Sequence, residues 1–360
     1  MRGNIINLDE SRRINDETFA EWTARLTPKP GDLLFAREAP VGPVVEIPNG
    51  ISIAPGQRTM LLRADPTKAN SRFLRYYLIS PATQARLHAL AHGSTVPHLR
   101  LPVVRNFKVS LPDLPVQVAI SQVLGALDDK IAANTKISQT SNELASTLYR
   151  QALSKAEFSE DTFDDLALVS GGGTPNTKNP DYWDGNIPWA TPSDITALMG
   201  PYLEETSRVI SDAGLEACAS NLYPKGSILM TSRATIGAFA IAQKPTAVNQ
   251  GFIVVQPNDP GLRYWLFHEM QSRVDEFVSL ANGATFLELS RGNFKKFKVR
   301  KATTAVMYEF NKRAIALHAS AQSVLAENAM LAATRDALLP QLISGKLRVK
   351  DAEAVVESVV

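Results

Sequence analysis

Cysteine and long apolar runs are nearly absent from this chain. Its 360 residues include one cysteine, Cys218, which rules out an intramolecular disulfide framework and suits a reducing compartment. No apolar run approaches the roughly 18–20 residues that a membrane-spanning helix needs. The opening residues Met1–Asn4 lack the apolar core of a signal peptide. We therefore expect a cytoplasmic protein without a membrane segment.

Excess charge is also small. The formal net charge is +2, from 38 Lys and Arg against 36 Asp and Glu, and this balance neither demands nor excludes a nucleic-acid partner. Basic residues do gather between Arg291 and Lys301. This cluster is either a phosphate-facing patch or a solvated strand edge protected by lysines.

Catalytic residue sets are missing as well. Asn179–Tyr182 resembles the Asn-Pro-Pro-Tyr motif of adenine methyltransferases, but it lacks the second proline and no Gly-rich cofactor fingerprint precedes it. Pro112-Asp113 with Asp128–Lys130 imitates a nuclease pattern that needs carboxylates on adjacent strands to hold Mg²⁺, yet Asp128 falls in a predicted helix. The five histidines and Cys218 show no metal-ligand spacing. We expect a chain that is not an enzyme and holds no cofactor or metal of its own.

The chain does contain an internal repeat. Gly31–Gly42 reads like Gly226–Gly237, 195 positions later, and His92–Thr95 reads like Asn282–Thr285, 190 positions later. Self-similarity on this scale indicates two related modules in one chain. Two similar modules predict two similar binding tasks.

A heptad-patterned segment closes each half. The positions are spaced alternately by four and three residues, and the spacing recurs in register 190 positions later, which predicts two long helices, each about 60 Å, that pair with each other. Polar seam positions such as Asn328 and Arg335 weaken packing but can fix register. The seam positions are Ile120, Leu124, Leu127, Ile131, Asn134, Ser138, Ser141, Ala145, Leu148 and Ala152, then Phe310, Ala314, Leu317, Ala321, Val324, Asn328, Leu331, Arg335, Leu338 and Leu342.

These patterns predict an α+β fold with two similar modules and two long coiled-coil helices that pair with each other. The second module contains Asp161–Ile195, which has no partner in the first, so the first module is expected to lack about 35 residues at its start. The predicted division is residues 1–113 for the first module, 114–158 for the first long helix, 159–302 for the second module, 303–345 for the second long helix and 346–360 for the tail.

Local patterns add secondary structure to this division. Short β-rich runs predict strands in the first module at Asp32–Ala36, Val41–Ile47 and Thr59–Leu62. Phe73–Leu90 should be helical with a break at Pro81. Further strands are expected over Phe163–Val169 and, after the second long helix, over Lys346–Lys350.

Several short motifs carry a family resemblance. They are Gly173-Thr-Pro175, Tyr182-Trp183, Ile187-Pro-Trp189, Asn249-Gln-Gly251, Leu127-Asp-Asp-Lys-Ile131 and Arg335–Gly345. In this order, and with the duplication, they resemble the specificity (S) subunit of type I restriction–modification systems over nearly the whole chain. The short first module departs from that pattern.

The resemblance implies a non-catalytic DNA-reading scaffold. Each target-recognition domain would read one half of a bipartite asymmetric site, and the two long coiled-coil helices would lie antiparallel and set the unread spacer. Two methyltransferase subunits and a restriction/translocase subunit would be partners, and S-adenosylmethionine, ATP and Mg²⁺ would belong to them. The alternative is a degenerate subunit that reads one half-site or serves assembly only, with self-association of two copies. A stand-alone enzyme is the disfavoured third possibility.

The candidate DNA-contacting residues are chosen by their chemistry. Polar side chains on loops read base edges, whereas Arg and Lys hold phosphates; each candidate could equally serve a loop hydrogen bond or a cap. Trp183 and Trp189 are expected to be core or loop anchors rather than base-stacking platforms. The candidates are Arg37, Gln57, Arg58, His92, Ser94 and Thr95 in the first module, Thr174, Tyr182, Ser232, Arg233, Asn249, Gln250, Asn282 and Thr285 in the second, and Lys295 and Lys296 as phosphate contacts.

Overall fold

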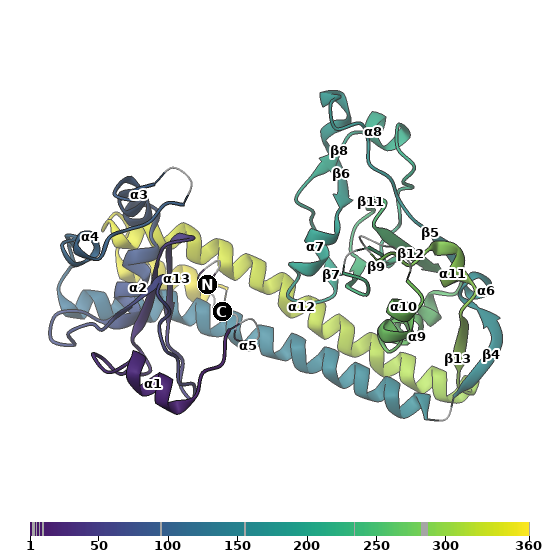
Figure 1. The fold of residues 1–360 in the computed structure, drawn as a ribbon, viewed down its shortest axis with the longest axis horizontal. Coiled ribbons are helices and arrows are strands. Elements are labelled where there is room, and N and C mark those ends of the chain that lie inside the picture. The colour runs from purple at the N-terminus through teal and green to yellow at the C-terminus, as the bar shows by residue number, and fades with distance from the viewer. Residues whose placement is uncertain are drawn as a thin grey trace. The chain divides into compact units, whose positions relative to one another are not determined.

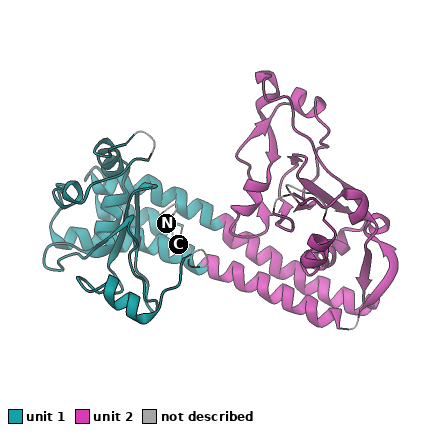
Figure 2. Ribbon diagram, viewed as in Figure 1, with its two compact units in different colours: residues 1–133, 327–360 teal, residues 134–326 magenta. Residues whose placement is uncertain are grey.

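The computed structural model describes residues 1, 4, 6, 8, 11–93, 96–154, 156–233, 235–281 and 287–359. The chain divides into two compact units, which are coloured separately in Figure 2. Unit 1 comprises residues 1–133 and 327–360, and unit 2 comprises residues 134–326. The two long helices α5 (Leu114–Leu153) and α12 (Thr304–Ile343) contribute residues to both units.

Unit 1 contains an antiparallel sheet of three strands in the order β2-β1-β3 (Figure 1). The three predicted strands of the first module are confirmed, and so is the helix break at Pro81, where α2 ends and α3 begins. Its elements, besides the long helices, are α1 (Asp16–Trp22), β1 (Leu33–Arg37), β2 (Val41–Glu46), β3 (Thr59–Leu62), α2 (Ser71–Ile79), α3 (Pro81–Ala89), α4 (Leu101–Arg105) and α13 (Val349–Glu357).

Unit 2 contains a five-stranded sheet in the order β5-β12-β9-β10-β7 and two smaller sheets, β11-β6-β8 and β13-β4. Its strands are β4 (Glu157–Thr162), β5 (Ala167–Ser170), β6 (Trp183–Ala190), β7 (Tyr202–Leu203), β8 (Val209–Ile210), β9 (Ile228–Thr231), β10 (Phe239–Ala242), β11 (Ala247–Val248), β12 (Phe252–Pro257) and β13 (Lys298–Lys301). Its helices are α6 (Phe163–Leu166), η1 (Pro180–Tyr182), α7 (Pro192–Thr196), α8 (Asp212–Glu216), η2 (Pro260–Leu262), α9 (Arg263–Gln271), α10 (Val274–Ser279) and α11 (Arg291–Lys295).

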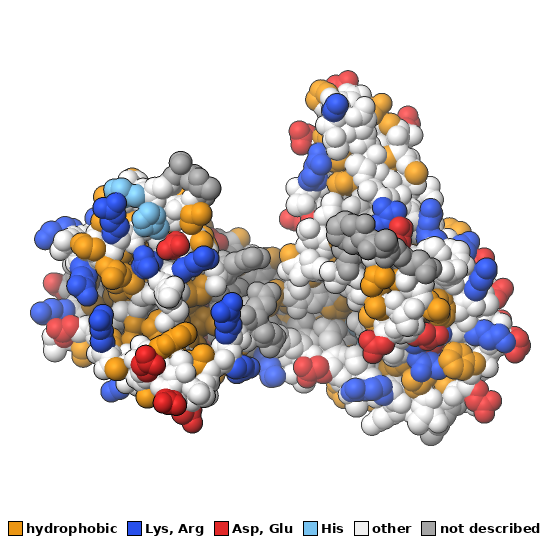
Figure 3. All heavy atoms as spheres, viewed as in Figure 1, with side chains coloured by type: hydrophobic (Ala, Val, Ile, Leu, Met, Phe, Trp, Pro, Cys, Tyr) orange, Lys and Arg blue, Asp and Glu red, His pale blue; other side chains and the backbone are white. Residues whose placement is uncertain are grey.

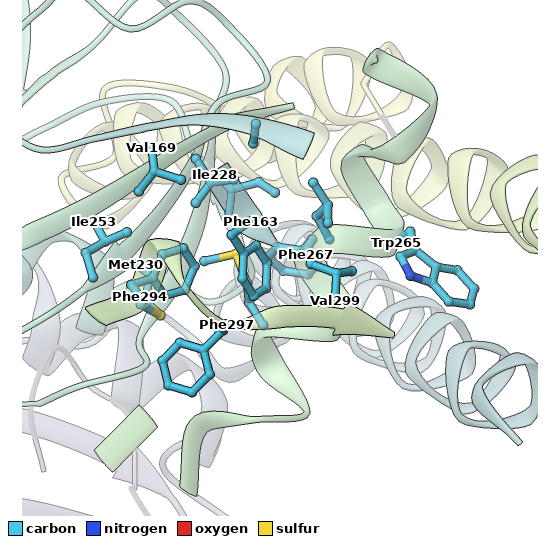
Figure 4. Close-up of a cluster of buried hydrophobic side chains, with 14 of the residues drawn as sticks. Phe163, Val169, Ile228, Met230, Ile253, Trp265, Phe267, Phe294, Phe297 and Val299 are labelled. Carbon is cyan, nitrogen blue, oxygen red and sulfur yellow. The ribbon is translucent and has the colours of Figure 1, made fainter. Parts of the chain in front are cut away.

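The main core of unit 2 lies between the five-stranded sheet and its helices. Figure 4 shows side chains from α6, β5, β9, β12, α9 and α11 meeting there. The rings of Phe163 and Phe294 stack with centroids 4.5 Å apart, and the indole of Trp265 donates a hydrogen bond to the carbonyl oxygen of Arg300 at 2.8 Å. Each fully buried large apolar side chain stabilises the fold by about 1.5–3 kcal/mol.

The sequence repeat is also a backbone repeat. Strands β1 and β9 each lie between two antiparallel neighbours, and each is preceded by a glycine with positive φ, +85° at Gly31 and +91° at Gly226. The amide of Gly31 donates to the carbonyl of Ile47 at 3.0 Å, as the amide of Gly226 donates to that of Ala242 at 2.7 Å. The predicted similarity of the two modules is confirmed. Strands β5 and β6 fall inside the insert 161–195 and have no counterpart among the described residues of the first module.

The long helices pair with each other in each unit, as the heptads predict, and they run antiparallel, as the family resemblance implies. In unit 1, Asp128 Oδ1 of α5 lies 2.7 Å from Arg335 Nη1 of α12. Further along α5, the backbone carbonyl of Ile131 accepts a hydrogen bond from the side-chain Nδ2 of Asn328 at 3.2 Å. In unit 2, the rings of Tyr149 and Phe310 lie 5.7 Å apart. Two polar seam positions, Asn328 and Arg335, thus make cross-helix contacts.

Two local expectations are wrong in part or in whole. Phe163–Val169 is not one strand, because a capping box in which Thr162 and Asp165 bind each other starts the short helix α6 before β5 begins. Lys346–Lys350 is not a strand either: the helix α13 begins at Val349, and its residues Ala352 and Val356 enter the unit 1 core at helical spacing. In unit 2, the segment 190 positions after residues 108–111 is the strand β13. Residues 108–111 themselves form no strand, so they offer no sheet edge with which the tail could pair.

The predicted domain boundaries are not tested by this division into units, and they stay a prediction. Among the described residues, no helix is both long and apolar enough to cross a membrane.

Candidate nucleic-acid interface

A hollow in unit 2 brings together several predicted DNA-contacting residues. It has a volume of about 600 Å³ and lies where β5 and β9 end and where β12 and α11 begin. The predicted residues that line it are Ser232, Arg233, Gln250 and Lys295, and Glu288 and Arg291 also line it. On the face drawn in Figure 3, Lys and Arg side chains are spread over both units with Asp and Glu between them.

Arg233 is held at this hollow by its own backbone and by a carboxylate. It forms a single antiparallel β-bridge with Glu288, and its Nε lies 2.8 Å from Glu288 Oε1. The residues beside the bridge point inward, since Ser232 is 3% exposed and Leu289 1% exposed. The Arg233 and Glu288 side chains, in contrast, are 44% and 42% exposed. Alternation along extended backbone therefore turns this pair toward solvent.

Three other predicted residues have internal hydrogen-bonding roles. Thr174 Oγ1 donates to Gln250 Oε1 at 2.6 Å, which joins the two loops that carry them, and both side chains are exposed. Asn249 Oδ1 accepts from the amide of Gly251 at 2.8 Å in a local turn. Ser232 is buried. Thr174 and Gln250 can therefore reach a ligand, whereas Asn249 and Ser232 shape the loop.

Aromatic residues anchor the insert that the first module lacks. Tyr182 is half-buried, Trp183 and Trp189 are buried, and the indole of Trp189 donates to the carbonyl of Gly173 at 3.0 Å. The guanidinium carbon of Arg208 lies 3.4 Å from the centroid of the Trp183 ring. Both tryptophans are thus loop anchors, as expected. Arg208 is an exposed cation that sequence reasoning missed, because nothing in its own neighbourhood marks it.

The basic segment Arg291–Lys301 is largely ion-paired within unit 2. Lys295 Nζ lies 2.8 Å from Asp164, Lys298 Nζ 2.9 Å from Glu160 and Lys301 Nζ 2.5 Å from Asp161. Lys296 is exposed, and no carboxylate of the described residues lies within ion-pair distance of it. The pairing supports the strand-edge interpretation for β13 itself, while Lys295 and Lys296 precede the strand.

In the first module, the predicted DNA-contacting residues lie near the ends of the strands that are equivalent to those at the hollow in unit 2. Arg37 donates through Nη2 to the carbonyl of Gln57 at 2.7 Å, and the exposed Arg58 lies 3.6 Å from Glu38. Glu38 forms a single antiparallel bridge with His98, and His98 forms another with His92. Arg37, Gln57, Arg58 and His92 therefore lie close in the fold. The predicted residues Ser94, Thr95, Asn282 and Thr285 lie outside the described residues.

A hydrogen-bond chain with a buried centre fastens the second module to both long helices within unit 2. His268 of α9 and His318 of α12 face each other with Nε2 atoms 3.1 Å apart. Ser146 Oγ lies 3.4 Å from His268 Nδ1, His318 Nδ1 lies 2.7 Å from the Tyr202 hydroxyl, and that hydroxyl donates to Asn142 Oδ1 at 3.2 Å. The chain begins and ends on α5. It is satisfied when both imidazoles are neutral and one donates to the other.

Burial controls the protonation of these histidines. Loss of hydration lowers the pKa of His268 to about 4, and burial together with the neighbouring His268 lowers the pKa of His318 to about 3. In unit 1, burial alone would raise the pKa of Asp128, but hydrogen bonds from Tyr76 and Arg335 and the charge of Arg75 lower it. Asp128 lies in α5, as predicted, and it binds side chains of its own fold.

Among the described residues, no group of three or more His, Cys, Asp or Glu side chains is placed to hold a metal ion. The hollow in unit 2 offers hydrogen-bond donors, acceptors and cations at its rim. This set of groups suits the binding of a polyanion that also carries hydrogen-bonding groups.

Comparison with known proteins agrees with this interpretation of the hollow. The family model described as "Type I restriction modification DNA specificity domain" matches residues 10–142 and 156–300. The MjaIX specificity subunit of a type I restriction enzyme from Methanocaldococcus jannaschii is 36% identical over 137 residues, which cover 38% of this chain and 32% of that protein. The HindI specificity subunit from Haemophilus influenzae is 22% identical over an alignment covering 89% of this chain and 87% of that protein.

Solved structures share the fold, among them the type I restriction–modification S subunit from M. genitalium, with a TM-score of 0.56 and 16% identity, covering 89% of this chain and 84% of that one.

Proposed function

Because the chain belongs to the type I restriction–modification DNA specificity family, we propose that it reads a bipartite, asymmetric DNA site, one half with each module. Members of this family are the non-catalytic DNA-recognition components of type I systems, and they assemble with the other subunits of those systems. We further propose that this chain scaffolds methyltransferase subunits, two in number, and a restriction/translocase subunit.

One observation carries the proposal: the same backbone frame occurs twice with different side chains at its exposed positions. The bridge Arg233–Glu288 has its counterpart in the bridge Glu38–His98, at offsets of 195 and 190. In each case the next residue, Leu289 or Leu99, is buried and its amide donates to the opposite strand. A repeated scaffold with unlike surface chemistry is what reading two unlike half-sites requires.

The helix pair supports the spacing part of the proposal. Each long helix has 40 residues without interruption, and a packed coiled coil holds a distance that a flexible linker could not. Recognition modules must reach successive faces of the duplex, about one helical turn or 34 Å apart. S-adenosylmethionine, ATP and Mg²⁺ would belong to the partner subunits. We place the complex in the cytoplasm, where cellular DNA lies.

The test is methylated-base mapping with the chain and its methyltransferase subunit produced together. The expected result is modification at one asymmetric site made of two specified parts with an unread spacer of constant length. A complex that modifies no sequence preferentially, or does so equally without this chain, would refute the proposed function.

A second candidate is a degenerate subunit that reads one half-site or serves assembly only. The same mapping decides between the two, because this candidate leaves only one specified part, or a symmetric site if two copies associate.

A further inference from the structure

We infer that Arg233 and Glu288 together read one G·C base pair, with Arg233 on guanine and Glu288 on cytosine. The inference rests on the proposed DNA-reading function and names the base pair that the hollow in unit 2 recognises. Glu288 is not one of the residues that sequence patterns indicate.

The backbone places the two side chains side by side. Residues joined by an antiparallel bridge carry Cβ atoms about 4.5–5.5 Å apart on the same face, and Arg233 and Glu288 form such a bridge. The buried neighbours Ser232 and Leu289 fix which face this is, and the amide of Leu289 donates to the carbonyl of Ser232 at 3.0 Å. The pair is therefore presented on a rigid frame rather than on a free loop.

The ion pair leaves the groups that recognise bases available. Its closest contact joins Arg233 Nε and Glu288 Oε1 at 2.8 Å, and both side chains are more than two-fifths exposed. The terminal nitrogens of an arginine held through Nε can fork onto O6 and N7 of guanine, and a carboxylate can accept from the N4 amino group of cytosine. Those atoms lie on neighbouring edges of one G·C pair in the major groove, so an adjacent Arg and Glu match them.

The surroundings supply the phosphate contacts that such reading needs. Arg291 and Lys295 line the same hollow, and contacts from cations to phosphates position a protein on the duplex without carrying sequence information. Gln250, joined to Thr174, stands at the same hollow.

The first module provides an internal comparison. Its equivalent bridge holds Glu38 and His98, which lack the fork of an arginine. The frame is the same and the side chains differ, so the two half-sites should differ at the equivalent base pair.

The experiment is a binding selection on randomised duplexes, using the full chain assembled with its methyltransferase subunit. Arg233→Ala and Glu288→Ala should each lose about 10-fold preference at one and the same G·C pair, because each removes one of the two base contacts, and a single base contact is worth about this much discrimination. Arg233→Lys keeps the charge but not the fork, so it should lose the same preference while retaining affinity for random DNA. Glu160→Gln, which alters an exposed ion pair with Lys298 elsewhere in unit 2, is the matched control and should leave the preferred sequence unchanged.

Four results would overturn the inference. A Glu288→Ala variant whose preferred sequence equals that of the wild type rejects the pair. A change at different base pairs in the two variants rejects it, as does a uniform loss over all sequences. If Arg233→Ala does not assemble, Arg233→Lys decides alone, and unchanged preference in that variant rejects the inference.

The same selection separates this inference from the function on which it rests. A wild-type complex that selects no sequence refutes the proposed function itself. A selective wild type with unaffected variants refutes only the reading of the G·C pair by Arg233 and Glu288.

Discussion

His268 and His318 face each other across the contact between α9 and α12, with their Nε2 atoms 3.1 Å apart and both side chains buried. Each imidazole also has a partner at its other nitrogen, Ser146 for His268 and Tyr202 for His318. A proton added to either ring would remove an acceptor from this hydrogen-bond chain. This arrangement therefore makes the attachment of the second module to the helices depend on neutral histidines.

We expect unit 2 to lose stability as the pH falls below about 6.5. Folding lowers the pKa of His268 to about 4 and that of His318 to about 3, so the unfolded chain binds more protons than the folded chain between those values and about 6.5. The free energy of unfolding should fall by up to roughly 1.4 kcal/mol per pH unit for each histidine. Tryptophan fluorescence during urea unfolding at pH 7.5 and pH 5 measures this, because three of the four tryptophans, Trp183, Trp189 and Trp265, lie buried in unit 2, whereas Trp22 of unit 1 is 56% exposed.

The matched control is the double variant His268→Gln and His318→Gln. It removes both titrating groups, so its urea midpoint should vary less between the two pH values than that of the wild type. Equal pH dependence in the wild type and the double variant would show that other groups, such as carboxylates, control acid stability.

Asp128 and Asp129 offer a contrast between adjacent carboxylates of α5. Asp128 is 17% exposed and binds Arg75, Tyr76 and Arg335, whereas Asp129 is 70% exposed and binds Arg72. Asp128→Ala should destabilise unit 1 by about 3–5 kcal/mol, because it leaves the partly buried Arg75 without its ion-pair partner and removes the cross-helix contact to Arg335. Asp129→Ala should cost at most about 1 kcal/mol. Urea unfolding followed by circular dichroism compares the two, and equal losses would contradict the cross-helix role of Asp128.

Leu127 and Leu331 are both fully buried in the core that the long helices share in unit 1. Leu127→Ala and Leu331→Ala should each cost about 2–5 kcal/mol of stability and weaken binding of the methyltransferase subunit, because the helix pair is the proposed docking surface. Ile137→Ala, at an exposed position of α5, is the control for stability. Normal unfolding of both leucine variants would reject the importance of the seam.

Lys295 and Lys296 should hold phosphates. Replacing both with Ala should weaken binding to all DNA sequences alike, and the slope of log affinity against log salt should drop by roughly 0.9 for each phosphate that the variant no longer neutralises. Lys312→Ala on the exposed surface of α12 should leave that slope unchanged. An altered target sequence with an unchanged slope would show instead that these lysines read bases.

The purified chain should neither consume S-adenosylmethionine nor cut DNA by itself, since catalysis belongs to the partner subunits of this family. Turnover assays with the chain alone, and with the methyltransferase subunit added back as the positive control, measure this. Activity of the chain alone would contradict the assignment.

The sequence by itself determined the features that depend on local periodicity and on similarity within the chain. The heptad spacing predicted α5 and α12 and their pairing, because a stripe of apolar residues every three to four positions must be buried along one helix face. The duplicated glycine motifs predicted the equivalent strands β1 and β9, since both depend on a turn with positive φ.

Only the tertiary structure decided which distant side chains meet. Nothing local to Glu288 marks it as the partner of Arg233, and nothing local to His268 places it opposite His318; each pair is joined by sheet register or helix packing between segments far apart in the chain. The tail became α13 rather than a strand for the same reason, because a strand needs a sheet edge and a helix needs only a core to cover. Spacing within the sequence reports the local preference of the chain, whereas contacts between segments depend on the packing of the whole unit.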